Sequence, residues 1–117
     1  MPKDDGFLLD MLLAARLLRK FAEGTTWEIF QKDEMIQSAI RYQGQVLGEA
    51  ANQVSSEFRR QHREIPWDRL IGLRHRLVHG YRDVELDRVW RLVERDASRL
   101  ISALEKLVPQ DEDTTSH

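Results

Sequence analysis

The sequence predicts an all-α protein, an up-and-down bundle of four to five helices. Apolar residues recur three or four positions apart along most of the 117 residues, and few stretches alternate apolar and polar residues. The first pattern lines one face of a helix, and the second is the mark of a half-buried strand. The chain is long enough for one domain with a small core. We therefore expect a single helical domain over residues 1–108 and an acidic, disordered tail over residues 109–117.

The first helix is expected over residues 7–22, after a polar, frayed segment 1–5 whose aspartates can act as caps. Its core-facing stripe consists of Leu8, Met11, Leu12, Ala15, Leu18 and Phe21. A second stripe of Leu9, Leu13 and Leu17 lies about 100° away around the helix. Two stripes indicate a helix covered on two sides, by its own core and by another subunit. A helix buried deeply in a small bundle is the alternative.

A second helical stretch follows the first. Residues 23–24 (Glu-Gly) end the first helix, and Thr25 with Glu28 forms a capping-box pattern for the next. Helical spacing then continues to about Gln61, although Asp33 equally fits the start of a new helix after a short one. The core face of this stretch carries Ile36, Ile40, Leu47, Ala50 and Val54.

Two glycines, Gly44 and Gly48, interrupt this stretch. Glycine is a poor helix former, so the pair indicates a place where another backbone comes close. Glu49 follows among small apolar residues. A carboxylate there can orient Arg74 or a histidine, but nothing in the spacing requires that contact. We therefore expect Glu49 to be an exposed or capped acid.

Two further helices complete the bundle. The third starts at Pro66, because proline favours the first helical position, and ends at Gly80, which suits the left-handed position after a helix. Its buried side carries Trp67, Leu70, Ile71 and Leu77. The fourth starts between Val84 and Asp87, with Asp83 as a cap. Its apolar positions are Val89, Trp90, Val93, Ala97, Leu100, Ile101, Leu104 and Val108.

Positive charge gathers in one part of the chain. The net charge is −2, yet residues 59–82 hold seven arginines, only two acids and three of the four histidines. A solvated arginine-rich face is the ordinary interpretation of such a run. The alternative is a basic groove on an otherwise acidic body, which would admit a phosphate backbone at that place.

Composition excludes several classes of site. The chain has no cysteine, and therefore no disulfide framework, thiolate nucleophile or cysteine metal site. The apolar run 7–15 contains Asp10, so it predicts neither a signal peptide nor a membrane span. We expect a cytoplasmic protein that does not contact a membrane.

The stretch from Arg74 to Tyr81 carries the chemistry. Arginine holds phosphate with a planar fork of donors, and an imidazole such as that of His79 moves protons near neutral pH. Together they can break a phosphodiester without a metal or other cofactor. The two residues lie about 140° apart on an ideal helix, so they converge only across a cleft, through an unwound last turn, or in a two-fold dimer. The structural alternatives are an ordinary ion pair for Arg74 and a charge at the helix C-terminus for His79.

A metal site is a second interpretation of the same stretch. His75 and His79 are four residues apart, as in zinc-binding histidine pairs on one helix face. However, no glutamate lies between them, Arg74 and Arg76 would repel a dication, and no cluster of acids completes a shell. We therefore expect no metal.

These residues and several others resemble one superfamily. The R-x-x-x-x-H pattern of Arg74 and His79, followed by Tyr81, is similar to the HEPN superfamily, and most closely to its HepT-like toxins. The resemblance spans about residues 7–108. The matching motifs, in order, are residues 27–33 (WEIFQKD), 47–50 (LGEA), 65–67 (IPW), 71–74 (IGLR), 77–81 (LVHGY) and 89–90 (VW).

The resemblance implies a HEPN-type bundle that forms a homodimer and acts as the endoribonuclease toxin of a type VII-like toxin–antitoxin system. Arg74 and His79 would be catalytic, with His75 and Arg76 in supporting, phosphate-binding positions. The products would be a 2′,3′-cyclic phosphate and a 5′-hydroxyl. Tyr81 would accept AMP from an MNT-type nucleotidyltransferase antitoxin, and RNA would be the substrate.

Two positions depart from the family pattern, and one other function stays open. His75 stands where relatives often carry asparagine, and Arg82 stands where they often carry an apolar residue. The alternative function is a non-catalytic helical module that binds a nucleotidyltransferase partner.

Overall fold

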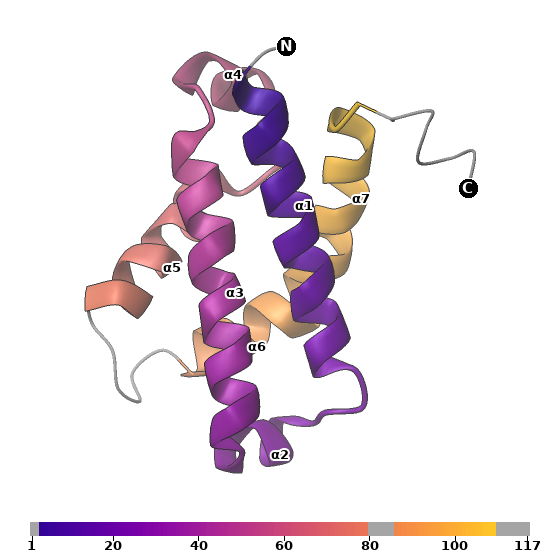
Figure 1. Cartoon of the computed structure of the whole chain (residues 1–117), viewed down its shortest axis with the longest axis vertical. Helices are drawn as coiled ribbons and strands as arrows, with labels where there is room; N and C mark the ends of the chain where they lie inside the picture. The colour runs from indigo at the N-terminus through magenta and orange to yellow at the C-terminus, as the bar shows by residue number, and fades with distance from the viewer. Residues whose placement is uncertain (1–2, 80–85, 110–117) are drawn as a thin grey trace.

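The computed structural model describes residues 3–79 and 86–109. All elements assigned in these residues are helical, which confirms the all-α prediction (Figure 1). They are α1 (Lys3–Ala22), α2 (Trp27–Lys32), α3 (Glu34–Gln53), α4 (Ser56–Gln61), α5 (Trp67–His79), α6 (Leu86–Arg91), the π-helical turn η1 (Leu92–Asp96) and α7 (Ala97–Leu107).

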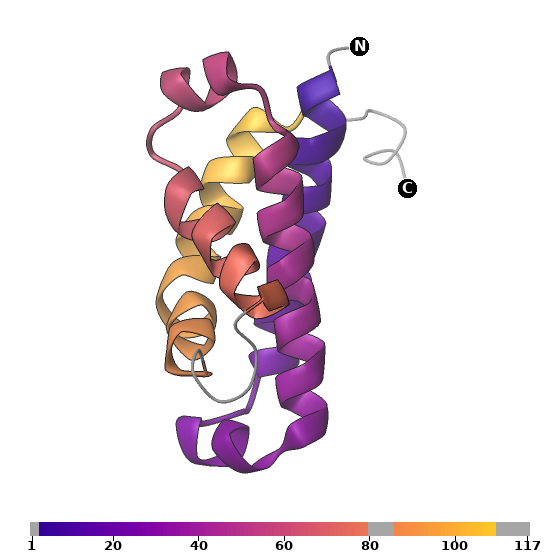
Figure 2. The same ribbon diagram turned by 90° about the vertical axis from the view of Figure 1, so that its left-hand side faces the viewer.

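The long helices form an up-and-down bundle. α1 and α3 run antiparallel and pack along each other, α5 packs on α3, and α7 packs on α1. The short helices α2 and α4 lie at opposite ends of this arrangement (Figure 1). Figure 2 views the bundle from the side on which α5 lies, so that α5 stands in front, against α3. The predicted tail over residues 109–117 lies outside the described residues except for Pro109.

Most of the residues that helical spacing selected lie in the core, although Phe21, Ile36, Ile71, Trp90 and Val108 are only partly buried. The largest fully buried side chains are Leu8, Met11, Leu18, Phe30, Ile40, Leu47, Val54, Ile65, Val89 and Leu104. The second stripe of α1 is different, because Leu9 and Leu13 remain 43% and 47% exposed. The expectation of a deeply buried first helix is therefore wrong, and a cover from another subunit stays a prediction.

The first helix begins earlier than expected. Residues 3–5 are helical rather than frayed, because Asp4 has partners across the fold. Its Oδ1 accepts from the Ser55 backbone N–H at 2.9 Å, and its Oδ2 accepts from the Ser55 hydroxyl at 2.7 Å. The first turn of α1 is thus tied to the start of α4.

The second helical stretch is divided at two places. Thr26, not Thr25, caps α2, because its hydroxyl accepts from the N–H of Ile29 at 3.3 Å. Asp33 caps α3 through the N–H of Ile36 at 3.0 Å, which confirms a new helix there. A continuous helix to Gln61 is wrong, since the chain is extended at Val54 and Ser55. The hydroxyl of Ser55 then caps α4.

The C-terminal segment contains a π-helical turn that apolar spacing does not reveal. The N–H of Ala97 donates a hydrogen bond to the carbonyl of Leu92, five residues back. This turn therefore contains one residue more than the hydrogen-bonded turn of an α-helix. The start of α6 at Leu86 agrees with the expected range. Gly80 and Asp83, the expected helix end and cap, lie outside the described residues.

Two of the tryptophans matched in the family motifs serve packing. Trp27 of α2 lies 6.3 Å from Trp90 of α6 between ring centroids, and Phe30 lies 5.1 Å from Trp90. This aromatic cluster holds the α2 end of the bundle against α6.

Candidate active site and basic surface

Arg74 lies where α5 comes closest to α3. A Cβ added at Gly48 would lie 2.6 Å from the carbonyl oxygen of Leu70 and even closer to the Cβ of Arg74. At Gly44, an added Cβ would lie 3.2 Å from Cδ1 of Leu77. The glycines therefore permit the close approach of backbones that the sequence predicted. Gly48 in particular fixes where the Arg74 side chain leaves the helix.

The guanidinium of Arg74 is held by α3. Its Nε lies 3.0 Å from Oε1 of Glu49, with the two side chains 32% and 47% exposed. The other oxygen of Glu49 accepts from Nε2 of Gln53 at 3.2 Å. The expectation that Glu49 is merely an exposed or capped acid is wrong, because it pairs with Arg74. Spacing along α3 gave no sign of this contact, since the partner belongs to another helix.

The two histidines of α5 lie side by side. The rings of His75 and His79 have centroids 4.7 Å apart and planes inclined by 49°. Both residues are exposed. Arg74 and His79 have different partners, Glu49 and His75, as expected for residues about 140° apart on a helix. Within one chain the imidazole pair and the Arg74 guanidinium therefore occupy neighbouring faces of α5.

Arg76 lies on the other side of the histidine pair. It is three residues before His79, which places it about 60° from His79 around α5. It lines a small pocket of about 90 Å³ between α5 and the start of the C-terminal segment. The other arginines around this pocket are Arg69, Arg88 and Arg91.

No metal centre is evident in the described part of the chain. Among residues 3–79 and 86–109, three or more histidine, aspartate or glutamate side chains nowhere gather closely enough to hold an ion. His75 and His79 thus supply two imidazoles without a third ligand nearby in these residues.

A more apolar pocket adjoins Arg74 on its other side. Its volume is about 360 Å³, and it lies between α1, α3 and α5. Phe7, Tyr42, Val46 and Val78 supply its apolar lining. Tyr42 and Val78 are 62% and 39% exposed. The site therefore adjoins apolar surface that no other part of the described chain covers.

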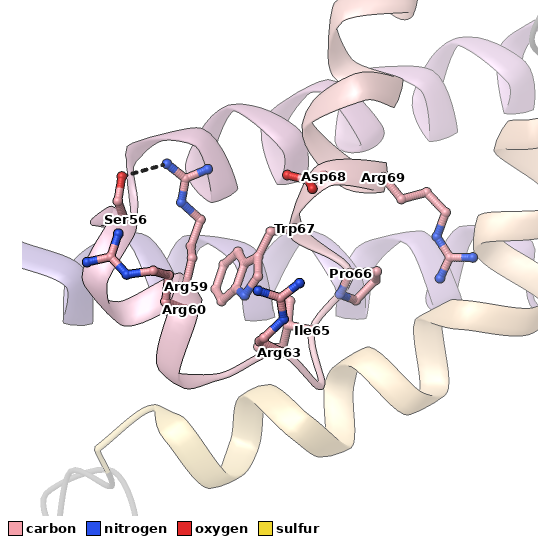
Figure 3. Close-up of a pocket in the computed structure, with 9 residues that line it drawn as sticks. All are labelled: Ser56, Arg59, Arg60, Arg63, Ile65, Pro66, Trp67, Asp68 and Arg69. Atoms are coloured by element: carbon pink, nitrogen blue, oxygen red, sulfur yellow. Dashed lines mark hydrogen bonds between the residues drawn. The ribbon is translucent and has the colours of Figure 1, made fainter.

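The arginines of residues 59–82 do not form one patch. Arg74 faces α3, whereas four other arginines surround a pocket of about 530 Å³ at α4 and the start of α5 (Figure 3). We call it the arginine pocket; it is lined by Ser56, Arg59, Arg60, Arg63, Ile65, Pro66, Trp67, Asp68 and Arg69. The charge count left a solvated face and a basic groove both open, and the sequence did not show that these arginines and Arg74 lie on different faces.

The remaining candidate residues lie outside the described residues. These are Tyr81, the expected AMP acceptor, and Arg82. In the described residues, no helix is both long enough and apolar enough to cross a bilayer.

The chain is similar to proteins of one family. Residues 11–107 match the family described as "Ribonuclease HepT-like". A protein named "Probable ribonuclease HepT" from Thermococcus cleftensis is 32% identical over 101 residues, which cover 86% of this chain and 92% of that protein. A "Putative RNase" from Methanocaldococcus jannaschii is 27% identical over 99 residues, 85% of this chain and 91% of that protein. Another from Caldanaerobacter subterraneus is 25% identical over 105 residues, 90% of this chain and 94% of that protein. No solved structure matches the chain.

Proposed function

Because the chain belongs to the HepT-like ribonuclease family, we propose that it is a metal-independent endoribonuclease and the toxin of a toxin–antitoxin pair. The observation that carries this proposal is the exposed imidazole pair of His75 and His79, with an arginine on either side. RNA cleavage by this route needs a proton acceptor, a proton donor and a cation for the phosphate. All three kinds of group are present at the end of α5.

The reaction uses the 2′-hydroxyl of RNA as its nucleophile. His79 takes the proton as the 2′-oxygen attacks the adjacent phosphorus, and Arg74 stabilises the charge on the phosphate oxygens. The bond from phosphorus to the 5′-oxygen breaks, and a protonated histidine gives its proton to that oxygen. The products are a 2′,3′-cyclic phosphate and a 5′-hydroxyl. DNA lacks the nucleophile and should resist cleavage.

Two arrangements supply the second histidine. In the first, His79 of a two-fold partner donates the proton, and the Arg74 residues of both chains line one groove. In the second, His75 of the same chain serves, since its ring lies beside that of His79. The exposed Tyr42 and Val78 next to Arg74 support the first arrangement, because a second copy would cover them. In that case His75 and Arg76 place the phosphate.

Control by a partner follows from the same stretch. We propose that a nucleotidyltransferase antitoxin transfers AMP from ATP to the hydroxyl of Tyr81 and releases pyrophosphate. Tyr81 is two residues from His79 in the sequence, so the added phosphate brings negative charge close to the groups that bind RNA. Transfer would raise the mass of the wild-type chain by one adenylyl group (AMP less one water) and leave that of Tyr81→Phe unchanged.

The first test is expression of the chain alone in a bacterial host. Wild type, Arg74→Ala and His79→Ala are compared by growth and by the integrity of total RNA. We expect growth arrest with fragmented RNA for wild type. Loss of a catalytic group of this kind costs about 10²–10⁴-fold in rate, so both variants should leave RNA intact.

The matched control is Arg19→Ala, which removes an exposed arginine from the last turn of α1. It should fragment RNA as wild type does. All variants should retain their helical content by circular dichroism. Normal growth and intact RNA with wild type at the same expression level would contradict the proposal and favour the non-catalytic module that binds a nucleotidyltransferase.

A further inference from the structure

The arginine pocket holds cations that lack acidic partners. Within the described residues, Arg59, Arg60 and Arg63 form no ion pair with a carboxylate. The buried Nε of Arg59 has no hydrogen-bond partner there, and its Nη2 has only a long contact of 3.5 Å to the Ser56 hydroxyl. Unpaired donors and uncompensated charge both favour an external anion.

The acids near this pocket do not neutralise it. Asp68 is exposed in the first turn of α5, where its charge is favourable to the helix dipole. Asp96 lies 3.6 Å from Nη2 of Arg69 and compensates that arginine of the pocket. Glu64 faces Nδ1 of His62 at 3.6 Å. Three arginines thus remain for a ligand.

Side-chain contacts hold the segments around the arginine pocket together. Nε1 of Trp67 donates to the carbonyl of His62 at 2.9 Å, and the ring of His62 stacks on Phe58 at 4.1 Å between centroids. These contacts tie the end of α4 and the following loop to the start of α5. The guanidinium groups in Figure 3 therefore project from a fixed corner of the fold.

A line of arginines connects this corner to the histidines. Arg69 lines both the arginine pocket and the smaller pocket that contains Arg76. The two are seven residues apart and share one side of α5. From Arg69 to His79 the helix rises about 15 Å at ~1.5 Å per residue. That length corresponds to about four nucleotides of a stacked strand at ~3.4 Å each.

We propose that the arginine pocket is a distal subsite for the backbone phosphates of single-stranded RNA, at least about four nucleotides from the scissile bond. This inference rests on the proposed ribonuclease function and adds a length requirement to it. A strand bound at His79 follows Arg76 and Arg69 along α5 and places its next phosphates on Arg59, Arg60 and Arg63. A dinucleotide reaches the histidines only.

The test uses the full chain and a 12-nucleotide RNA with 2′-O-methyl groups, which has no free nucleophile. Binding is measured by fluorescence anisotropy at several salt concentrations for wild type and Arg60→Gln/Arg63→Gln. Removing one cation that neutralises a phosphate lowers the salt slope of single-strand binding by about 0.7. We expect the double variant to lower it by about 1.4 and to bind roughly tenfold more weakly.

The control is Arg19→Gln/Lys20→Gln, which removes the same charge from the last turn of α1. That turn lies at the end of the bundle away from α4. This variant should bind as wild type does. Cleavage of a dinucleotide should be equal for all three proteins, whereas cleavage of an unmodified 12-mer should show a raised KM only for Arg60→Gln/Arg63→Gln.

The outcomes separate this inference from the proposed function. Wild-type affinity and salt slope in the double variant would overturn the subsite. The subsite would also be overturned if the double variant bound RNA as wild type does but lost affinity for a nucleotidyltransferase partner. The pocket would then recognise an acidic protein surface. Loss of RNA binding in the variant, with no cleavage by wild type, would keep the subsite and refute the nuclease.

Discussion

At the scale of single residues, the pair of Arg74 and Glu49 serves orientation more than stability. Both side chains are partly exposed, and exposed ion pairs contribute only about 0.2–1 kcal/mol to folding. A guanidinium carries five N–H groups, and this pair engages the one on Nε. The remaining donors form the fork that suits phosphate oxygens. Glu49 thus acts as a positioning residue for the proposed catalysis.

Replacing Glu49 with glutamine separates its effect on the orientation of Arg74 from its effect on stability. In Glu49→Gln we expect kcat for RNA cleavage to fall about tenfold, because the loss of a charged hydrogen-bond partner of about 1.5 kcal/mol frees Arg74 to move. KM should not rise, since removing an acid beside the phosphate does not weaken RNA binding. Steady-state kinetics and thermal melting measure both effects.

The matched control is Glu105→Gln, which breaks the surface pair of Glu105 and Arg16. That pair has a distance of 2.9 Å and similar exposure, but it lies away from α5. It should change neither kcat nor KM. An unchanged kcat in Glu49→Gln would show that Arg74 keeps its catalytic orientation without the ion pair to α3.

At the scale of elements, the contact between α3 and α5 depends on Gly48. An alanine there would press its Cβ against the carbonyl of Leu70 and the Cβ of Arg74. Backbone atoms cannot rotate away, so the two helices must separate. Overpacking of this kind costs typically about 1–3 kcal/mol, which exceeds the gain of up to about 1 kcal/mol in helix propensity.

We therefore expect Gly48→Ala to lower the free energy of unfolding by about 1–2 kcal/mol, as measured by urea titration. Gly72→Ala is the control, because Gly72 lies within α5 and nothing stands within 4 Å of an added Cβ. It should be neutral or stabilising. Equal effects of the two substitutions would contradict the close approach at Gly48.

Much of this element-level structure was predictable from local sequence, and some was not. Helical spacing selected the buried positions of α1, α3 and α7, because each face repeats along its own helix. Thr25 and Thr26 are both able to cap, so the position of the cap was wrong by one residue. The break at Val54 and the π-helical turn at Leu92 leave the apolar pattern nearly unchanged.

The candidate site was predictable only in part. The residues Arg74, His75 and His79 stood out by their chemistry, and their positions on α5 follow from spacing. Glu49 was considered as a partner of Arg74 but was expected to be an exposed or capped acid, because the pattern along α3 gives the direction of its side chain but not the helix that faces it. The same reason hid the separation of Arg74 from the arginine pocket.

At the scale of the whole molecule, exposed apolar side chains remain on α1, α3 and α5. Of these helices, α1 packs on α3, and α3 packs on α5. Leu9 and Leu13 of α1, Tyr42 of α3 and Val78 of α5 are exposed. Exposed apolar residues that form a continuous patch mark interaction sites. Tyr42 and Val78 line one pocket beside Arg74, and the proposed homodimer would cover them and bring two copies of α5 together.

We expect wild type to be a dimer by light scattering, and Leu13→Lys or Tyr42→Lys to shift it to a monomer. A lysine in a buried apolar interface loses its hydration without a partner. Met35→Lys is the control, since Met35 is 81% exposed in the first turn of α3. A dimer that survives both substitutions would place the interface on another face, and a monomeric wild type would refute the homodimer.

The bond between Asp4 and Ser55 has a practical consequence for such measurements. One hydroxyl, that of Ser55, donates to Asp4 and accepts from the N–H of Phe58, so it joins the first turn of α1 to α4. A purification tag fused ahead of Asp4 would disturb these hydrogen bonds between α1 and α4. Its effect would reach the helix that carries Arg59 and Arg60, far along the chain. Protein intended for RNA titrations is therefore better tagged after residue 117, or cleaved free of its leader before use.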